Sequence, residues 1–313
     1  MKNRYIQTIR GFLILFVIII HSITESNSDI ENIFLIIVRT LCNVAVPLFI
    51  VFAGYFFNEQ KYKESKEFIL KKILRLLIPL LIYNILYFIL SMEFDIWKLL
   101  IFNTAAHLYY ILVIIQLILL TPLIIKYNSL KKIFFIITPI YLLIYRFIWM
   151  SSGQSMIPLP QYYFVAWSIY YIVGLMLKHN NILNIKKYHV LIVFILIMGY
   201  NIFIYYKLGL EYALSQMNIP NMIFSILVSI YLINNKKDNI DENIFSKIGD
   251  NSFGIYFIHL FVIMVLNKML GNIDFNPIIF TILKTVITIF VSYYGIKTFT
   301  KITKNKFNKF LGF

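Results

Sequence analysis

The stretch from Arg10 to His21, RGFLILFVIIIH, places an unbroken run of ten apolar residues between an arginine and a histidine. With its flanks the run extends over about 6–24, close to the roughly 20 predominantly apolar residues that a helix needs to cross a bilayer. Nine further windows of this kind follow along the 313 residues. The sequence therefore predicts a membrane protein built from helices.

The composition excludes a soluble surface, because 60% of the residues are apolar and only 14% are charged. We expect an all-α, polytopic integral membrane protein with about ten transmembrane helices. A single transmembrane domain is predicted over 1–313, with a basic cytoplasmic tail at 301–313. The expected spans are 6–24, 32–57, 68–91, 106–125, 132–150, 162–178, 188–206, 219–234, 252–268 and 277–299.

The positions of the cations orient these helices. Cytoplasmic loops of membrane proteins carry an excess of Lys and Arg. Of the 29 Lys and Arg residues, 23 lie in or beside the N-terminal segment, the even-numbered loops and the tail, whereas the five opposite loops hold three. We therefore expect both termini in the cytoplasm. Basic loops beside anionic lipid account for the net charge of +15 without a nucleic-acid partner.

Cysteine usage limits the chemistry. Cys42 is the one cysteine of the sequence and lies within an apolar run, so disulfides, iron–sulfur clusters and cysteine-rich zinc sites are excluded. We expect no metal site. The first apolar run is followed by His21 and not by a small-residue cleavage site, and we therefore interpret it as a retained helix and not as a signal peptide.

Ionisable side chains at membrane depth cost a few kcal/mol or more, which makes them candidates for function. Arg10 and His21 are eleven residues apart, or three helical turns plus about 20°, so both point from one face about 16 Å apart. One face thus carries a cation near the cytoplasm and an imidazole in the outer half of the membrane. All 14 Asp and Glu residues are expected in loops or at helix ends.

The other membrane cations and imidazoles extend this pattern. A basic inner mouth is expected at Arg10, Lys71, Lys72 and Arg75. A group of cations and imidazoles is expected above it, at His21, Arg39, His107 and His259. For His107 and His259 the alternative role is a hydrogen bond between helices. We expect Arg146 and Lys284 to extend their side chains to the membrane interface.

Four short motifs follow one another along the chain. The first helix has an Arg, ten residues and a His; the others are VPLFIVFAGYF at Val46–Phe56, KKILRLLIP at Lys71–Pro79 and NSFGIYFIH at Asn251–His259. Together with about ten helices, these motifs resemble the acyltransferase 3 family of integral-membrane O-acyltransferases over essentially the whole chain. Two positions depart from the family pattern. Ala53 replaces a Ser before Gly-Tyr, and Lys72 takes the first place of Arg-x-x-Arg.

The resemblance implies an enzyme that moves an acyl group, most simply acetyl, from cytoplasmic acyl-CoA to a hydroxyl group. The acceptor is expected to be a cell-surface polysaccharide or a lipid-linked glycan at a bacterial plasma membrane. Acyl-CoA, the glycan and membrane lipids are then the partners. The donor phosphates are expected at Arg75, Lys72 and Lys71, although a lysine lacks the bidentate fork with which arginine binds phosphate.

The same resemblance gives roles to the membrane residues. The catalytic group is expected at His21, Arg10, Arg39, His107 and His259. An imidazole titrates near neutral pH, so His21 suits a general base that takes the proton from the acceptor hydroxyl. Arg39 or His107 would stabilise the developing negative charge. Arg10 is too far from His21 for direct contact and would orient it through an intermediate group.

A transporter or flippase for a lipid-linked sugar or polysaccharide is the alternative interpretation, because many helices and interior cations also suit an anionic lipid carrier. Two features argue against it. Proton-coupled transporters usually bury carboxylates, and broken helices in matching halves are typical of transporters; the chain is expected to have neither. A membrane scaffold or sensor is a third interpretation, but it gives no reason for Arg10 and His21.

Overall fold

The computed structural model describes residues 3–65, 67–91, 94–152, 160–179, 183–237, 240–271, 273 and 275–313. Within these residues every regular element is a helix. This confirms the all-α class that the composition predicts.

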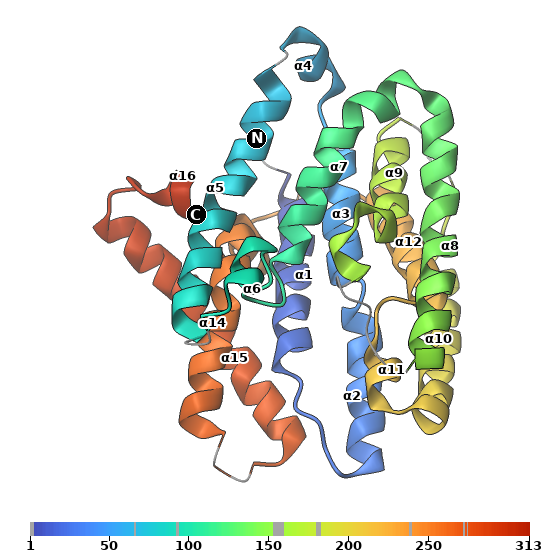
Figure 1. The fold of residues 1–313 in the computed structure, drawn as a ribbon, viewed down its shortest axis with the longest axis vertical. Helices are drawn as coiled ribbons and strands as arrows, with labels where there is room; N and C mark the ends of the chain where they lie inside the picture. Colours follow the sequence, from blue (N-terminus) through green and yellow to red (C-terminus); the bar gives the residue numbers. More distant parts are fainter. Residues whose placement is uncertain are drawn as a thin grey trace. The chain divides into compact units, whose positions relative to one another are not determined.

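The helices of the described residues follow one another along the chain as shown in Figure 1. The α-helices are α1 Arg4–Ser22, α2 Asp29–Cys42, α3 Ala45–Tyr55, α4 Glu59–Glu64, α5 Glu67–Ser91, α6 Ile96–Leu100, α7 Tyr109–Lys126, α8 Asn128–Ser152, α9 Ser168–Leu177, α10 Lys187–Leu208, α11 Leu210–Leu214, α12 Ile219–Asn234, α13 Ile244–Asp250, α14 Ser252–Leu270, α15 Pro277–Ile302 and α16 Asn308–Leu311. Two 3₁₀ helices, η1 Pro160–Tyr162 and η2 Phe164–Ala166, precede α9.

Nine helical segments in the described part of the chain are long and apolar enough to cross a membrane. Two of them combine neighbouring helices, α2 with α3 and α11 with α12. The nine coincide with nine of the ten predicted spans, and their ends agree to within a few residues, except that the segment with α11 begins at Leu210, nine residues before the predicted start at 219. The protein is therefore a multi-pass membrane protein.

The remaining predicted span, 162–178, is shorter in the structure. Its α-helix, α9, has ten residues and follows the two 3₁₀ turns. Ten residues rise about 15 Å, which is about half the hydrocarbon thickness of a bilayer. The start of α9 is fixed by Thr138 of α8, whose hydroxyl accepts the N–H of Ile169 at 3.2 Å. A neighbouring helix thus satisfies a donor that the first turn leaves unpaired.

The second predicted helix, 32–57, is divided in the structure. α2 ends at Cys42 and α3 begins at Ala45, with a two-residue turn between them. Pro47 explains the division, because proline has no N–H to donate and its ring clashes with the carbonyl four residues earlier, here that of Asn43. The prediction of one continuous helix is wrong at this point.

The chain divides into two compact units, neither of which is continuous in sequence. The first unit consists of Met1–Val46, Asn184–Gln216 and Leu227–Phe313. The second unit consists of Pro47–Leu183 and Met217–Ile226.

In the first unit α14 and α15 form an antiparallel hairpin, and α1 packs against both (Figure 1). Polar contacts join the end of α1 to the start of α15. The N–H of Thr24, two residues after α1, donates to the Thr281 hydroxyl at 3.1 Å, and the Asn276 amide donates to the Glu31 carboxylate of α2. The first of these contacts fixes the level at which α1 and α15 lie beside each other.

The two ends of the chain lie at the opposite end of this group. Arg4, the first residue of α1, pairs with Asp250 at 2.9 Å, directly before α14 begins. Phe313 packs edge-on against Phe299 and lies beside Gly254 in the first turn of α14. The start of α1 and the last residue of the chain are therefore at the same end of the first unit.

The short helix α13 crosses α1 so closely that a side chain has no space at two positions. A Cβ on Gly11 would lie 2.0 Å from the carbonyl oxygen of Phe245. A Cβ on Gly249 would lie 1.8 Å from the carbonyl oxygen of Gln7. Each helix therefore has a glycine where the backbone of the other passes, as in close helix contacts within membranes.

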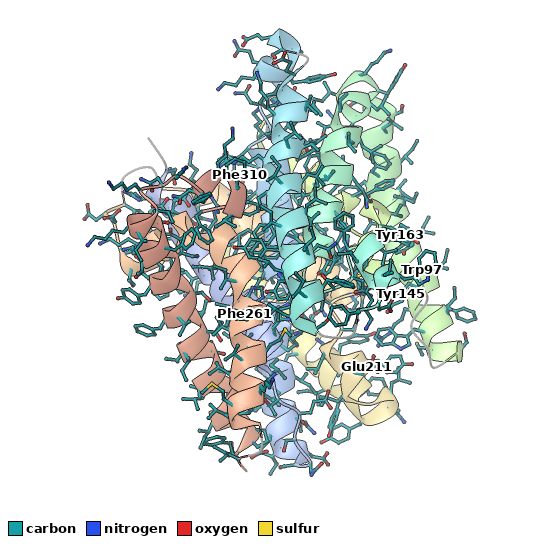
Figure 2. The ribbon with its side chains drawn as sticks, turned by 60° about the vertical axis from the view of Figure 1, so that its left-hand side comes forward. Trp97, Tyr145, Tyr163, Glu211, Phe261 and Phe310 are labelled. Atoms are coloured by element: carbon teal, nitrogen blue, oxygen red, sulfur yellow. The ribbon has the colours of Figure 1, made fainter. Side chains whose placement is uncertain are left out.

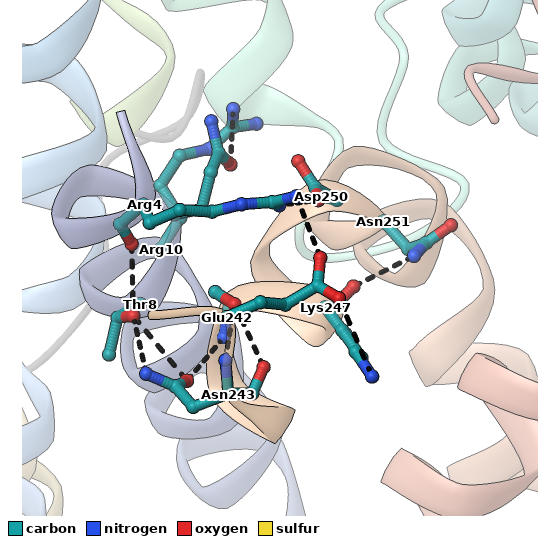
Figure 3. A network of polar contacts seen from close by, with 10 residues as sticks. Arg4, Thr8, Arg10, Glu242, Asn243, Lys247, Asp250 and Asn251 are labelled. Carbon is teal, nitrogen blue, oxygen red and sulfur yellow. Dashed lines mark hydrogen bonds and ion pairs between the residues drawn. The ribbon is translucent and has the colours of Figure 1, made fainter. Parts of the chain in front are cut away.

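A polar network surrounds this crossing (Figure 3). Arg4 pairs with Glu242 at 2.7 Å as well as with Asp250. The Asn243 amide donates to the Thr8 hydroxyl at 3.1 Å, and the same side chain caps α13 by accepting the N–H of Ser246 at 2.8 Å. The network holds α13 against the first two turns of α1, next to Arg10.

The second unit has a glycine crossing of its own, between α3 and α9. A Cβ on Gly54 would lie 2.3 Å from the Tyr171 carbonyl oxygen, and one on Gly174 would lie 2.1 Å from the Val51 carbonyl oxygen. The Tyr171 hydroxyl also bonds to the Thr121 hydroxyl of α7 at 2.7 Å within the buried interior. α9, although short, is thus firmly packed.

Large apolar side chains remain exposed on the surface of many helices. Figure 2 labels three of them: Trp97 of α6 with 74% exposure, Phe310 of α16 with 49% and Phe261 of α14 with 40%. Soluble proteins rarely expose so much apolar surface. A lipid environment accounts for it, in agreement with the nine apolar segments of the described residues.

Candidate functional site

α1 carries Arg10 and His21 on one uninterrupted helix. Its start is set by Asn3, whose side chain accepts the N–H of Ile6 at 3.0 Å, a standard N-cap. The eleven-residue spacing therefore corresponds to about 16 Å along the helix, as the sequence predicts. Arg10 itself contacts Gln7 one turn earlier, with Nη1 and Oε1 3.4 Å apart.

The structure brings two of the predicted site residues together. The rings of His21 on α1 and His259 on α14 lie with their centroids 5.3 Å apart and tilted by 47°. His259 is fully buried, whereas His21 is partly exposed. The two imidazoles therefore differ in exposure.

The backbone fixes the tautomer of His259. Its Nδ1 lies 2.6 Å from the carbonyl oxygen of Tyr256, one turn earlier in α14. A carbonyl only accepts hydrogen bonds, so Nδ1 carries the hydrogen. In the neutral ring Nε2 then carries no hydrogen, and its lone pair can accept a hydrogen bond.

Arg39 holds the backbone beside His21. Its Nη1 donates to the carbonyl oxygen of Ile20 at 2.8 Å, and its Nε donates to the carbonyl oxygen of Leu214 at 3.2 Å. Arg39 thus joins α2, the end of α1 and α11 within the first unit. The sequence places Arg39 at the depth of His21, but it gives no sign of α11. The expected role of Arg39 in stabilising negative charge stays a prediction.

His107 belongs to the second unit. It lies in the turn before α7, not within the helix, and is 2% exposed. Its ring meets that of Tyr87 edge-on, with centroids 5.4 Å apart. Its expected part in catalysis stays a prediction.

The three cations expected to bind the donor lie in the first turns of α5, also in the second unit. Lys71 is exposed and pairs with Glu67 at 2.7 Å. The Lys72 ammonium lies 4.8 Å from the centre of the Phe57 ring. Arg75 is exposed.

A fourth cation, Lys178, lies in the same region. It follows the last residue of α9, and its ammonium donates to the carbonyl oxygen of Phe57 at 2.7 Å. Lys72 and Lys178 therefore meet at one residue. From the sequence Lys178 is only a loop cation, since no spacing along the chain relates the end of α9 to the start of α5.

The expected position of Lys284 is wrong. Its side chain is 4% exposed and does not extend to the surface of the structure. Its ammonium lies over the Phe280 ring, 4.5 Å from the centroid. Arg146, for which the same interface role is expected, is partly exposed and stacks on Trp149 at 5.8 Å.

No group of three or more His, Cys, Asp or Glu side chains suited to a metal ion occurs among the residues that the structure describes. Helices of membrane-spanning length and a partly exposed imidazole beside a buried one define a membrane protein with a histidine pair between two of its helices. Such a site suits group transfer to or from a hydroxyl.

Comparison with known proteins identifies the family. The chain belongs to the acyltransferase 3 family, whose acyltransferase domain matches residues 3–297. The match covers both units and includes Arg10, His21 and His259. No curated protein matches the chain, and no solved structure does. The resemblance seen in the four motifs is thereby confirmed, and the protein is a membrane acyltransferase.

Proposed function

We propose that this acyltransferase moves an acyl group, most simply acetyl, from acyl-CoA to a hydroxyl of a cell-surface polysaccharide or lipid-linked glycan. The thioester C–S bond breaks and an ester C–O bond forms. The hydroxyl proton leaves the acceptor, and the CoA thiolate takes up a proton. The bacterial plasma membrane is the expected place for this reaction, since donor and acceptor meet there from opposite sides.

The observation that carries the proposal is the unequal pair of histidines. His21 is partly exposed and can take the proton from an acceptor hydroxyl as general base. His259 is buried behind it with a fixed tautomer, and its Nε2 is suited to accept a hydrogen bond from the His21 ring. In such a bond the other nitrogen of His21 carries no hydrogen, and it can accept the hydroxyl proton.

Two further groups support the transfer step. Arg39 bonds to the carbonyl of Ile20, so it keeps the backbone of His21 in place. A guanidinium has five N–H donors, and two of those of Arg39 serve carbonyls of α1 and α11. In this proposal the positive charge also stabilises the oxyanion of the tetrahedral intermediate, a role that His107 would share.

The phosphates of the donor require cations, and the start of α5 supplies them. Lys72, Arg75 and Lys178 are the candidates, because Lys71 is already paired with Glu67. The loop pattern predicts that this end of α5 faces the cytoplasm, where acyl-CoA is made. The flexible pantetheine arm would then carry the thioester into the membrane.

The first experiment measures acetyl-CoA binding by calorimetry and acetyl transfer with the purified protein in detergent. We expect the wild type to bind acetyl-CoA, His21→Ala to retain binding but lose about 10²- to 10⁴-fold in transfer rate, and Arg10→Ala to bind more weakly. A stable His21→Ala protein with wild-type turnover would exclude His21 as the base. No binding of any short acyl-CoA would reject the donor.

The donor site is tested separately on α5. Arg75→Ala should raise the Kd for acetyl-CoA by about tenfold, since a charge-assisted contact to phosphate contributes at least about 1.4 kcal/mol, with little change in turnover at saturation. Lys71→Ala is the matched control, because its exposed pair with Glu67 contributes little. Equal Kd values for the two variants would place the donor phosphates elsewhere.

A further inference from the structure

A buried lysine in the first unit has no role in the transfer step as proposed. Lys284 is the eighth residue of α15 and is 4% exposed. The Phe280 ring faces its ammonium at 4.5 Å, and among the described residues no carboxylate, carbonyl or hydroxyl bonds to it. A cation–π contact offsets part of the cost of burying an ammonium, but no negative charge of the described chain balances it.

This arrangement is costly for a structural residue. A lysine at membrane depth costs a few kcal/mol unless it is paired or hydrated. Methionine would fill the same volume and keep the contact with Phe280 without that cost. The charge therefore indicates a negatively charged ligand.

Hydroxyl groups continue the polar face of α15 beyond Lys284. The buried face of the helix contains Thr281, Lys284, Thr285, Thr288 and Ser292. These positions follow one another at helical spacing and lie on one side. The face that α15 turns inward is thus polar over about three turns.

Two of these hydroxyls have unused bonding capacity. Serine and threonine in helices commonly bond back to the carbonyl four residues earlier, and Thr285 does so, to Thr281 at 2.8 Å. Thr288 and Ser292 are 0% and 1% exposed, yet their hydroxyls have no partner among the described residues. Buried hydroxyls without partners are rare in native proteins, and here they lie one and two turns from Lys284.

The level of Lys284 along the bundle matches that of His21. The N–H of Thr24 bonds to the Thr281 hydroxyl, so these two residues lie at one level. Going backward along α1 and going forward along α15 both lead away from this level in the same direction. His21 is three residues before Thr24, and Lys284 is three residues after Thr281. The step along α15 is about 4.5 Å, and His21 is the last residue but one of α1. Lys284 and the proposed base therefore lie at about the same depth.

We propose that Lys284, with the hydroxyls of Thr288 and Ser292, forms a subsite for an anionic group of the acceptor, a carboxylate or a phosphate. This proposal rests on the proposed acyl transfer, because it makes the acceptor an acidic glycan or a phosphate-linked one. The subsite holds the anionic group while the hydroxyl to be acylated lies at His21. An anion at the donor end is a poorer fit, since Arg10 is about 16 Å away along α1.

The experiment compares wild type, Lys284→Met and the control Lys268→Met in detergent micelles. Lys268 is exposed in the last turn of α14, the other helix of the same hairpin, so its variant removes an equal charge from the surface. The thermal midpoint is measured with glucuronate, glucose 1-phosphate or neutral glucose. Acetyl transfer to the methyl glycosides of glucuronic acid and glucose is measured in parallel.

We expect an anionic sugar, but not glucose, to raise the midpoint of the wild type and of Lys268→Met, and to leave that of Lys284→Met unchanged. The sugar that acts tells a carboxylate ligand from a phosphate ligand. The preference for the anionic over the neutral glycoside, as a ratio of kcat/KM, should fall by at least about tenfold in Lys284→Met. An equal midpoint shift in both variants, or no shift in the wild type, would overturn the proposal.

The two readouts separate this inference from the proposed function. Midpoint shifts that depend on Lys284 in a protein that transfers no acetyl group would support the anion subsite and reject acetyl transfer. Transfer with wild-type acceptor preference in Lys284→Met would support the enzyme and reject the subsite.

Discussion

At the scale of single residues, the ring nitrogen Nε2 is the atom of His259 that can contribute to the site. The carbonyl of Tyr256 occupies Nδ1 at 2.6 Å, and only Nε2 is left for another group. His259 is fully buried, and the His21 ring is 5.3 Å away between centroids. His259 is therefore a positioning residue in our proposal, and His21 is the residue that touches the acceptor.

Two substitutions of His259 test this assignment. Asparagine can place its amide N–H where Nδ1 of His259 lies and keep the hydrogen bond to Tyr256, but it has no atom at the position of Nε2. Glutamine can place its amide oxygen at the position of Nε2, where it accepts a hydrogen bond. We expect His259→Gln to retain more transfer activity than His259→Asn, with similar KM values for acetyl-CoA. Activity is measured with protein of verified thermal midpoint. Equal activity in both variants would contradict a role for Nε2.

Arg39 leads to a prediction about stability. Its guanidinium donates to two carbonyls, those of Ile20 and Leu214. Each hydrogen bond from a charged donor contributes about 1.5–3 kcal/mol, so Arg39→Ala should lower the free energy of unfolding by about 3 kcal/mol or more. Arg39→Lys retains the charge but lacks the planar guanidinium that donates to two carbonyls at once, so we expect an intermediate loss of unfolding free energy. Denaturant unfolding in micelles measures both; an unchanged Arg39→Ala protein would contradict these contacts.

At the scale of elements, the crossing of α1 and α13 is the most demanding contact of the first unit. Gly11→Ala would place a methyl group 2.0 Å from a backbone oxygen of Phe245, which neither helix can relieve without moving. We expect a loss of about 3 kcal/mol or more in unfolding free energy, at the upper end for overpacking. Because Arg10 is the preceding residue in the chain, acetyl-CoA binding should weaken as well. Thermal unfolding and calorimetry measure the two effects.

Gly295→Ala is the control for this prediction. Gly295 lies in α15, and a Cβ there would meet nothing within 4 Å. Alanine is better than glycine inside a helix by about 0.8–1 kcal/mol, so this variant should be as stable as the wild type or slightly more so. If Gly11→Ala proved equally stable, the close approach of α13 to α1 would be wrong.

Most helices could be predicted from the sequence, because a spanning helix needs a long apolar run that is visible without neighbours. The departures have local causes. Pro47 divides the second span, and the sequence contains that proline, so this break could have been found. The late start of α9 depends on Thr138 of α8, a contact that no pattern along the chain reveals.

The candidate site could be predicted only in part. The periodicity of α1 shows that Arg10 and His21 share a face, since both belong to one helix. It does not show that His259 is the neighbour of His21, or that Arg39 bonds to the residue before it, because those contacts join separate helices. The burial of Lys284 cannot be predicted for the same reason: its place near a helix end favours a side chain that extends to the interface, whereas packing decides its direction.

At the scale of the whole molecule, the number of crossings decides which side each loop faces. Nine long apolar segments in the described residues would place the two chain ends on opposite sides. In the first unit, however, Arg4 pairs with Asp250 and Phe313 lies beside Gly254, so both ends are at the same end of the helices. An even number of crossings is required. The short α9, with the 3₁₀ turns before it, is the segment that can complete the tenth.

Cysteine labelling tests this topology, because the one native cysteine, Cys42, is buried and can be replaced by alanine. Single cysteines are then placed at four exposed lysines, Lys61, Lys207, Lys268 and Lys301. A membrane-impermeant maleimide should label intact cells at 207 and 268, and at 61 and 301 only after permeabilisation. If the α9 segment does not cross, every loop after it changes sides, and 301 would be labelled from outside while 207 and 268 would be protected. Lys61 precedes α9 and stays inside in either case, so it is the internal control, and the pattern at the other three positions decides whether a ten-residue helix with two 3₁₀ turns completes a membrane crossing.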